Sequence, residues 1–408
     1  MNILLINHYA GSPKHGMEFR PYYLAREWVR SGHAVTIVAA SFSHVRQCHP
    51  EVQSAVVHET IDGISYRWLP TPAYAGNGLR RALNIGSFLR QVWCDAKVLV
   101  ADVKPDVVIA SSTYPMDIWV ARYIARLAGA RLVFEVHDLW PASPIELSGM
   151  SPWHPFIMLC QKAENDAYRD ADLVVSMLPC VAEHMRAHGL DLKKLHIVPN
   201  GIAPDDWQAE PVPLDPRLLE HLRAQQAAGL TIVGYAGSHG LPNALDVLLD
   251  AAARLRNEPF AFVLVGDGME KPRLVQRVGE QQLDNVRLFA PIPKAQVPAL
   301  LREMTIAYIG WQRQAIYRFG IAPNKLLDYM MAGVPVLHSV QAGNNPVAEA
   351  DCGLTVEPES VDAVVHGLRR LAAVPAAERR AMGVRGRAFV SVHHSYPMLA
   401  QRFLEAIA

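Results

Sequence analysis

The feature that most constrains the fold is a regular alternation of short apolar runs and longer amphipathic segments. Residues 3–6 form an apolar run, residues 18–31 space their apolar side chains like a helix, and residues 35–39 form the next apolar run. A strand, a helix and a second strand in this order predict parallel strands joined by a helix that packs on the sheet. The same alternation continues to about residue 198, which indicates an α/β domain.

The alternation stops once and then starts again. Between residues 203 and 226, prolines stand among acidic residues, which predicts a linker. Strand-like runs then return at residues 231–236 and 260–265. We therefore predict two Rossmann-like, doubly wound α/β domains that face one cleft, with ligands at the carboxyl ends of their strands. The expected boundaries are an N-terminal domain at 1–202, a linker at 203–228, a C-terminal domain at 229–390, and a C-terminal helix at 391–408 that packs back on the N-terminal domain.

The bulk composition excludes several classes of protein. The chain has 408 residues and zero formal net charge, so nothing in it indicates nucleic-acid binding. The first residues lack the features of a signal peptide, and no apolar run approaches the length of a membrane span. Five scattered cysteines without a C-x-x-C pair indicate neither a disulfide framework nor a zinc site. We expect a cytoplasmic protein.

The first strand-to-helix loop does not have the pattern of a dinucleotide site. Gly11 and Gly16 do not form the G-x-G-x-x-G fingerprint, and no acid ends the second strand to hold a ribose. The sequence therefore disfavours an NAD-dependent dehydrogenase.

Residues 318–337, R-F-G-I-A-P-N-K-L-L-D-Y-M-M-A-G-V-P-V-L, predict a loop, a helix, a turn and a buried strand. Pro323 suits a first helical turn, where a missing N–H costs nothing. Asn324, Lys325 and Asp328 are the polar residues of the first two turns, where backbone N–H groups and the helix dipole favour an anion. This pattern indicates a site for a phosphate and a sugar diol. A solvated polar helix face is the alternative.

Two further loops offer backbone N–H groups at strand ends. Residues 237–240, G-S-H-G, form a strand-to-helix turn whose N–H groups can meet a phosphate, unless the glycines serve only the turn. Gly16 follows the first strand, where a small residue would let a phosphate approach the backbone. A simple loop glycine is the alternative there.

The order and spacing of the motifs resemble the retaining glycosyltransferases of family 4, which have the two-domain GT-B fold. The variant P-N-K-L-x-D-Y-M-x-A-G, with H-G-M-E-x-R-P near the start, is further similar to bacterial surface-polysaccharide transferases of the N-acetyl-L-fucosamine transferase type. The matching motifs are the glycine loop after the first strand, H-D at 137–138, A-D-L-V-V-S at 171–176, P-N-G at 199–201, G-Y-A-G at 234–237, V-G-D-G at 265–268, L-L-D at 326–328, A-G-V-P-V at 332–336 and D-C-G-L at 351–354.

The resemblance implies transfer of a hexose-type sugar from a nucleotide diphosphate, with UDP expected, to a lipid-linked saccharide in bacterial O-antigen, capsule or exopolysaccharide synthesis. The N-terminal domain would bind the acceptor and the C-terminal domain the nucleotide sugar. It also implies retention of the anomeric configuration and no metal or redox cofactor. With no clear carboxylate nucleophile, we expect a front-face attack in which a diphosphate oxygen takes the proton of the incoming hydroxyl.

The resemblance also suggests roles for single residues. His137 would lie near the donor sugar and stabilise the oxocarbenium ion through its backbone carbonyl, or bond a sugar hydroxyl; a structural histidine is the alternative. Asp328 would accept hydrogen bonds from the ribose diol. Glu18 and Arg20 are candidates for acceptor binding, unless they only start the helix.

The sequence departs from the family at two places. The family usually carries two glutamates with seven residues between them, whereas this chain has Gly320 at the first place and Asp328 at the second. The usual cations of the second domain's first loop and helix are also missing, and Lys325 is the expected replacement at the diphosphate. We therefore predict His137 and Lys325 as catalytic residues. The predicted donor-binding residues are Gly16, Gly237, Ser238, His239, Gly240, Asn243, Asn324, Lys325 and Asp328.

A basic helix expected from Leu79 to Lys97 has two interpretations. It could present a solvated face, or it could rest on anionic lipid at the inner face of the plasma membrane, where a lipid-linked acceptor would be found. Two rival functions also remain open, a UDP-sugar 2-epimerase with the same architecture and a non-catalytic nucleotide-sugar-binding relative.

Overall fold

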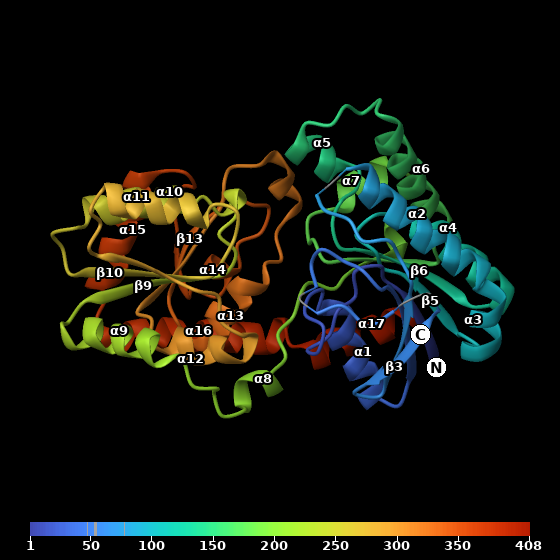
Figure 1. Ribbon diagram of the computed structural model, residues 1–408, viewed down its shortest axis with the longest axis horizontal. Coiled ribbons are helices and arrows are strands. Elements are labelled where there is room, and N and C mark those ends of the chain that lie inside the picture. The colour runs from blue at the N-terminus through green and yellow to red at the C-terminus, as the bar shows by residue number, and fades with distance from the viewer. Residues whose placement is uncertain (47, 53–54, 77) are drawn as a thin grey trace. The chain divides into compact units, whose positions relative to one another are not determined.

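The computed structural model describes residues 1–46, 48–52, 55–76 and 78–408. The chain forms two compact units, of which unit 1 comprises Met1–Asn200 and Tyr396–Ala408, and unit 2 comprises Gly201–Ser395. Each unit is a mostly or wholly parallel sheet with helices packed on its faces (Figure 1). The prediction of two Rossmann-like α/β domains is confirmed.

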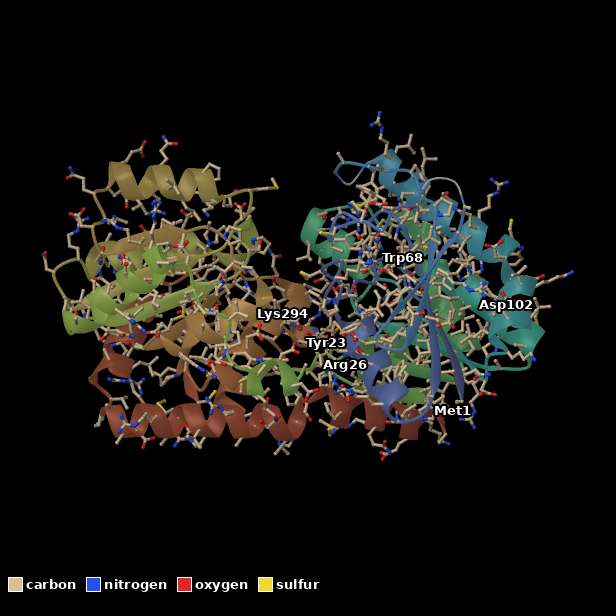
Figure 2. All side chains as sticks on the ribbon, turned by 60° about the horizontal axis from the view of Figure 1, so that its bottom comes forward. Met1, Tyr23, Arg26, Trp68, Asp102 and Lys294 are labelled. Atoms are coloured by element: carbon tan, nitrogen blue, oxygen red, sulfur yellow. The ribbon has the colours of Figure 1, made fainter. Side chains whose placement is uncertain are left out.

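The sheet of unit 1 has the strand order β3-β4-β2-β1-β5-β6-β7-β8. Its neighbours pair in parallel, except that β3 pairs with β4 in the antiparallel sense. Trp68 in β4 is fully buried among the side chains of this unit (Figure 2). The strands are β1 (Asn2–Ile6), β2 (Ala34–Ala40), β3 (Val57–Ile61), β4 (Ile64–Leu69), β5 (Val107–Ala110), β6 (Arg131–Val136), β7 (Leu173–Ser176) and β8 (Leu195–Ile197).

Helices cover both faces of this sheet. The first and last helices, α1 and α17, pack together on one face, and α2, α3, α4 and α6 cover the other (Figure 1). Coverage on both faces explains why β5 is buried at every residue and reads as an unbroken apolar run. The helices are α1 (Arg20–Arg30), α2 (Leu79–Cys94), α3 (Ala96–Val103), α4 (Asp117–Ala128), α5 (Ala142–Ser148), α6 (Pro155–Asp170), α7 (Ala182–Ala187) and α17 (Tyr396–Ile407).

The terminal helix α17 belongs to unit 1 although α16, the helix before it, lies in unit 2. Trp28 of α1 donates its ring N–H to the carbonyl of Ala400 at 3.2 Å and makes an edge contact with the buried ring of Phe403. Tyr23 stacks on Tyr396 with the ring centroids 4.8 Å apart. These aromatic contacts fix α17 on α1.

Unit 2 has a six-stranded, fully parallel sheet with the order β11-β10-β9-β12-β13-β14. Alternate side chains of each strand serve two cores, as when Ile232 packs with α9, α12 and α13 while Val233 packs with α10 and α15. Figure 1 shows these helices on the two faces. The strands are β9 (Thr231–Ala236), β10 (Phe260–Val265), β11 (Val286–Phe289), β12 (Ile306–Gly310), β13 (Val336–Ser339) and β14 (Gly353–Thr355). The helices are α8 (Asp205–Gln208), α9 (Pro216–Ala227), α10 (Leu245–Arg254), α11 (Lys271–Glu280), α12 (Val297–Arg302), α13 (Asn324–Ala332), α14 (Pro346–Glu349), α15 (Val361–Ala373) and α16 (Ala376–His393).

The segment expected as a linker, residues 203–228, instead contains α8 and α9 and belongs to unit 2. Helix α9 begins with Pro216, and the Asp215 side chain accepts a hydrogen bond from the Arg217 N–H at 2.9 Å. Leu218 and Leu222 then enter the core beneath β9. Proline marks a helix start as well as a linker, so the composition concealed this helix.

Among the described residues, no helix combines the length and the apolar character that crossing a bilayer requires.

Candidate active site

Two side chains follow neighbouring strands of unit 1 at their carboxyl ends. Ser111 comes directly after β5 and His137 directly after β6. The Nε2 atom of His137 lies 2.9 Å from the Ser111 hydroxyl and 3.3 Å from a carboxylate oxygen of Glu135. Ser111 donates to that same carboxylate oxygen at 2.6 Å. Parallel pairing of β5 with β6 therefore assembles a Ser111–Glu135–His137 cluster.

Glu135 is fully buried, yet it stays ionised. Burial alone would raise the pKa of its carboxyl, but the charges of Arg20 and His137 and the hydrogen bonds from His137 and Ser111 lower that pKa to about 2. An anionic carboxylate beside Nε2 requires that this ring nitrogen of His137 carry a proton. Glu135 thus fixes both the orientation and the tautomer of His137.

Arg20 was predicted to bind acceptor, and the structure gives it a different role. Its side chain is only 1 % exposed, and its Nε atom donates to Glu135 at 2.9 Å. The two terminal nitrogens donate to the carbonyls of Pro199 and Val198 at 2.6 and 2.7 Å. Because the guanidinium is directed inward at these three acceptors, it is not available to an acceptor saccharide. Arg20 instead holds Glu135 in place.

The loop before α1, which was expected to let a phosphate approach its backbone, differs in part from that expectation. Gly16 has a φ of +92°, a conformation that favours glycine, and its N–H donates to the carbonyl of Ser12 at 2.7 Å. This N–H is therefore occupied within the loop and does not offer itself to a phosphate. Glu18 is partly exposed, and its carbonyl accepts the N–H of Gly11 at 2.8 Å.

In unit 2, Lys325 reaches from the first turn of α13 to the turn that follows β9. Its Nζ atom donates to the hydroxyl of Tyr235 at 2.8 Å and to the side-chain oxygen of Asn243 at 2.6 Å. Asn243 and Tyr235 both donate in turn to the carbonyl of Ser238, at 2.9 and 2.6 Å. The Lys325 ammonium is thereby joined in one hydrogen-bond network to Tyr235, Asn243 and Ser238. Of these residues, only Tyr235 was not among the predicted donor-binding residues.

Burial lowers the pKa of Lys325 to about 8. The ammonium also lies 4.8 Å from the centroid of the Tyr235 ring, which favours its charged form. Two of its three donors are used by Tyr235 and Asn243. A Cβ atom at Gly237 would lie 3.3 Å from the end of the lysine side chain, so this glycine leaves room for Lys325.

The turn of residues 237–240 offers fewer groups than expected. The N–H of Gly237 donates to Val265 at 3.0 Å, and the N–H of His239 donates to Asp267 at 2.7 Å. The ring of His239 is completely buried, and burial, with the charges of Lys271 and Lys325, lowers its pKa to about 4. In this structure the N–H of His239 is used by Asp267 and the ring is buried, with no hydrogen-bond partner at either ring nitrogen among the described residues. Donor binding by His239 stays a prediction. Gly240 is part of the same turn.

Asp328 lies one turn further along α13. In the described part of the chain, its carboxylate forms no hydrogen bond or ion pair with Lys325. Burial raises the pKa of its carboxyl to about 6, the charge of Lys294 lowers it and that of Asp206 raises it. Lys294 and Asp206 themselves form an ion pair at 4.0 Å. Asp328 is therefore partly buried beside this pair, whereas Asn324 is exposed at the first position of the helix.

A separate cavity of about 460 Å³ opens at the carboxyl ends of β13 and β14. In this fully described part of the chain, none of the predicted donor-binding residues lines it. Its polar lining consists of Arg313, Gln341, Asn344, Asn345, Thr355 and Glu357.

Sequence reasoning did not single out Glu135, Ser111 or Tyr235. Glu135 was detectable in principle, because an acid inside the apolar run R-L-V-F-E-V is rare unless it is paired. Tyr235 stood inside a recognised motif, G-Y-A-G, but nothing in the sequence tells that its hydroxyl meets Lys325 from α13.

Comparison with known proteins identifies the family. The family described as Glycosyl transferase 4-like domain matches residues 15–201, and the family Glycosyl transferases group 1 matches residues 230–373. The chain is 26 % identical over 369 residues to WcaI of Escherichia coli K12, named as a colanic acid biosynthesis glycosyl transferase, covering 86 % of this chain and 87 % of that protein.

Solved structures agree on the fold. Sucrose-phosphate synthase from Thermosynechococcus elongatus superimposes with a TM-score of 0.75 at 17 % identity, covering 99 % of this chain and 98 % of that one. Anabaena HepE, solved with UDP and glucose, gives 0.67 at 16 % identity, again covering 99 % of this chain and 98 % of that one. The two family matches together cover most of the chain, and the chain belongs to the family 4 glycosyltransferases of bacterial polysaccharide biosynthesis, with the GT-B fold.

Proposed function

We propose that this glycosyltransferase moves a sugar from a UDP-sugar to a lipid-linked saccharide with retention of anomeric configuration, in O-antigen, capsule or exopolysaccharide synthesis. The observation that carries the proposal is the network that binds the Lys325 ammonium to Tyr235 and Asn243 beside the turn after β9. HepE, a structural neighbour, has been solved with UDP and with UDP-glucose, which supports a nucleotide-sugar donor.

Lys325 suits the leaving diphosphate for two reasons. It stands in the first turn of the nine-residue helix α13, where the helix dipole already favours an anion. Its pKa of about 8 leaves the ammonium mostly charged at neutral pH. We propose that the third hydrogen of the ammonium donates to a diphosphate oxygen and stabilises the charge that develops as the sugar leaves. The exposed side chain of Asn324 can donate beside it.

Asp328 is proposed to bind the ribose. A carboxylate accepts hydrogen bonds from two vicinal hydroxyls, and with a pKa of about 6 the group is mostly ionised at neutral pH. In this proposal Asp328 binds the nucleoside and Lys325 binds the diphosphate. The two side chains therefore need not contact each other.

His137 is the proposed contact for the transferred sugar. Its protonated Nε2 is held by Glu135 and Ser111, so the ring is fixed and its backbone carbonyl at the end of β6 has a defined direction. With no clear carboxylate nucleophile, a diphosphate oxygen would take the proton of the attacking hydroxyl in a front-face attack. We propose that this step needs no divalent metal, since Lys325 supplies the compensating charge.

We also propose that α2 and α3 rest on anionic lipid, where a lipid-linked acceptor is found. Leu79, Leu83 and Trp93 are 77 %, 59 % and 48 % exposed, and Arg90 lies on the same side of α2. Exposed apolar side chains interleaved with basic ones fit a surface that enters the headgroup region.

Replacing Lys325 with alanine is expected to weaken UDP binding by roughly 10- to 100-fold, because a charge-assisted hydrogen bond contributes about 1.5–3 kcal/mol. Isothermal titration calorimetry with UDP measures this directly. The control is Lys193→Ala, which removes an exposed lysine from unit 1. If Lys325→Ala binds UDP as tightly as the native protein, the assignment of the diphosphate site is wrong.

The affinity for UDP is expected to fall as pH rises through the pKa of Lys325, about 8 in the free protein. The ammonium is charged below this pKa and neutral above it, so its attraction for the diphosphate is lost by at most about tenfold per pH unit. UDP keeps a constant charge in this range, because its last phosphate pKa is near 6. Titrations between about pH 7 and 9.5 should show this loss in the native protein and a flat profile in Lys325→Ala; parallel profiles would contradict the proposal.

His137→Ala is expected to slow UDP release from the UDP-sugar substrate by at least about 10-fold while leaving the affinity for UDP itself unchanged. The assay offers a panel of UDP-sugars and measures free UDP. His58→Ala, which removes an exposed histidine of β3, serves as the matched control. Equal loss of UDP affinity and of rate would instead indicate that His137 only supports the fold.

Binding to vesicles that contain anionic lipid is expected to weaken by at least about fivefold in Arg90→Glu, because each basic residue at such a surface contributes about 1 kcal/mol and the new carboxylate is repelled by the lipid. Co-sedimentation with vesicles of neutral and of anionic composition measures the effect. Arg126→Glu changes an exposed arginine of α4 by the same charge and is expected to have no effect. Equal behaviour of the two variants, or no binding by the native protein, would exclude α2 as the lipid-facing helix.

A further inference from the structure

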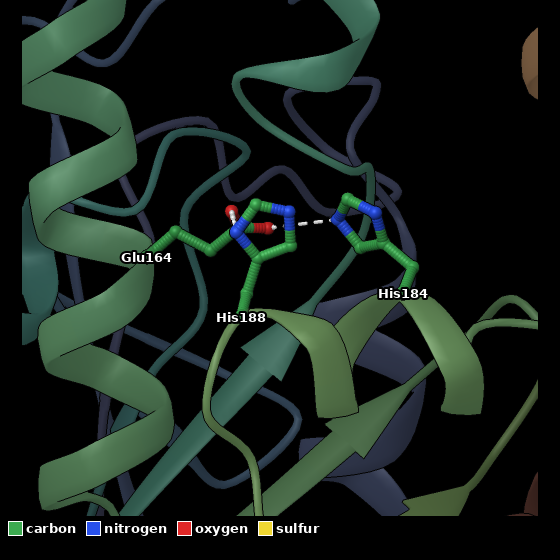
Figure 3. A group of neighbouring side chains, drawn as sticks. All are labelled: Glu164, His184 and His188. Atoms are coloured by element: carbon green, nitrogen blue, oxygen red, sulfur yellow. Dashed lines mark hydrogen bonds and ion pairs between the residues drawn. The ribbon is translucent and has the colours of Figure 1, made fainter.

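A cluster of metal-ligating side chains lies in unit 1 apart from every residue assigned above. Glu164 projects from α6, His184 lies on α7, and His188 follows the end of that helix (Figure 3). One ligand atom from each of the three lies within 4.8 Å of the other two. The two imidazole centroids are 4.5 Å apart. The histidines are four residues apart, a spacing that places two ligands on one face of a helix.

The carboxylate of Glu164 is buried without a permanent cation. Its side chain is 2 % exposed, and its ion pairs among the described residues are those with His184 at 3.4 Å and His188 at 4.0 Å. The hydroxyl of Tyr168 donates to one of its oxygens at 2.9 Å. A buried carboxylate needs a compensating charge, and the two histidines supply one only when they are protonated.

The surroundings hold more lone pairs than hydrogens. The side-chain nitrogen of Gln161 lies 2.7 Å from Glu164 Oε2, 2.9 Å from Asn165 Oδ1 and 3.0 Å from His188 Nδ1. An amide nitrogen has two hydrogens and cannot serve three acceptors fully. The Glu164 carboxylate, and His188 Nδ1 in the tautomer that leaves this nitrogen unprotonated, can therefore also accept from a cation.

We propose that Glu164, His184 and His188 bind a divalent transition-metal ion, with zinc as the preferred ion. Two histidines and one carboxylate are a set of protein ligands that zinc accepts, and they leave a fourth position for water or for the Gln161 amide oxygen. Ligands of one tetrahedral zinc stand about 3.3 Å apart, given bonds of about 2.0–2.1 Å. His184 Nε2 lies 3.4 Å from Glu164 Oε1, and His188 Nδ1 lies 4.0 Å from the other carboxylate oxygen, Oε2. The three ligand atoms, which lie within 4.8 Å of one another, would therefore have to move closer together by side-chain rotation when an ion binds.

The ion would connect α6 with α7 and hold Tyr168 through the shared carboxylate. Glu164 and Tyr168 also line a small cavity with Glu135, Asp138 and Trp140 at the carboxyl end of β6. The metal would thus stiffen one wall of the region that contains His137. Its role is structural, and it does not depend on the proposed donor or acceptor.

The test uses the full-length protein without a histidine tag, stripped of metal with a chelator. Cobalt(II) alone is titrated and followed by its visible absorption, and zinc alone is titrated in a thermal unfolding assay. We expect one equivalent of cobalt with an intense tetrahedral-type band, and a rise in the unfolding temperature with zinc. His188→Ala should weaken cobalt binding by at least about 10-fold, and His58→Ala should leave it unchanged.

The proposal is overturned if the native protein takes up no stoichiometric cobalt, or if His188→Ala binds cobalt as tightly as His58→Ala. A second variant, Glu164→Gln, keeps the size of the buried side chain and removes its charge, so it carries the comparison if His188→Ala does not fold. Binding that survives in both variants would place the metal elsewhere in the chain.

Discussion

The buried ion pair between Arg20 and Glu135 organises unit 1. It joins α1 to β6 near the carboxyl end of that strand, and the remaining donors of Arg20 fix the carbonyls of Val198 and Pro199 after β8. Breaking one partner of such a pair typically costs about 3–5 kcal/mol, because the other charge is left uncompensated. A hydrophobic pair at the same place could stabilise the fold equally well. The importance of the ion pair therefore lies in where it places the charge of Glu135. An ionised Glu135 can direct the proton of His137, and an apolar residue cannot.

In unit 2 the corresponding feature is the position of the Lys325 ammonium. This position depends on close backbone packing between the turns after β9 and β10. A Cβ atom at Gly266 would lie 1.8 Å from the carbonyl oxygen of Gly237, and one at Gly268 would lie 2.4 Å from that of His239. These glycines let the two turns touch, which leaves Tyr235 and Asn243 to receive Lys325 from α13.

The sequence predicted the layout well, since strands and helices leave local signals. The alternation of apolar runs located both sheets, and strand-end motifs located the polar loops. The linker was wrongly expected because prolines mark both flexible segments and helix starts, and only the burial of Leu218 and Leu222 separates the two. The inward direction of Arg20 and the burial of His239 were not foreseen, for a related reason. Their partners, Glu135 and the backbone of Asp267, are distant in sequence, and nothing local shows that a polar side chain is directed inward.

The departure of this chain from its family at residue 320 also has a structural basis. The family resemblance predicts a glutamate there, whereas this chain has Gly320, which follows the short 3-10 helix Ala315–Phe319 with a φ of +94°. A glutamate with this backbone conformation would be strained by about 1–3 kcal/mol. The path of this loop therefore disfavours any residue with a side chain at position 320, a glutamate included. In the proposed donor site, the charged groups come instead from the helix that follows, where Lys325 and Asp328 stand. The two side chains face different neighbours, Tyr235 and Asn243 for the cation and the Lys294–Asp206 pair for the acid.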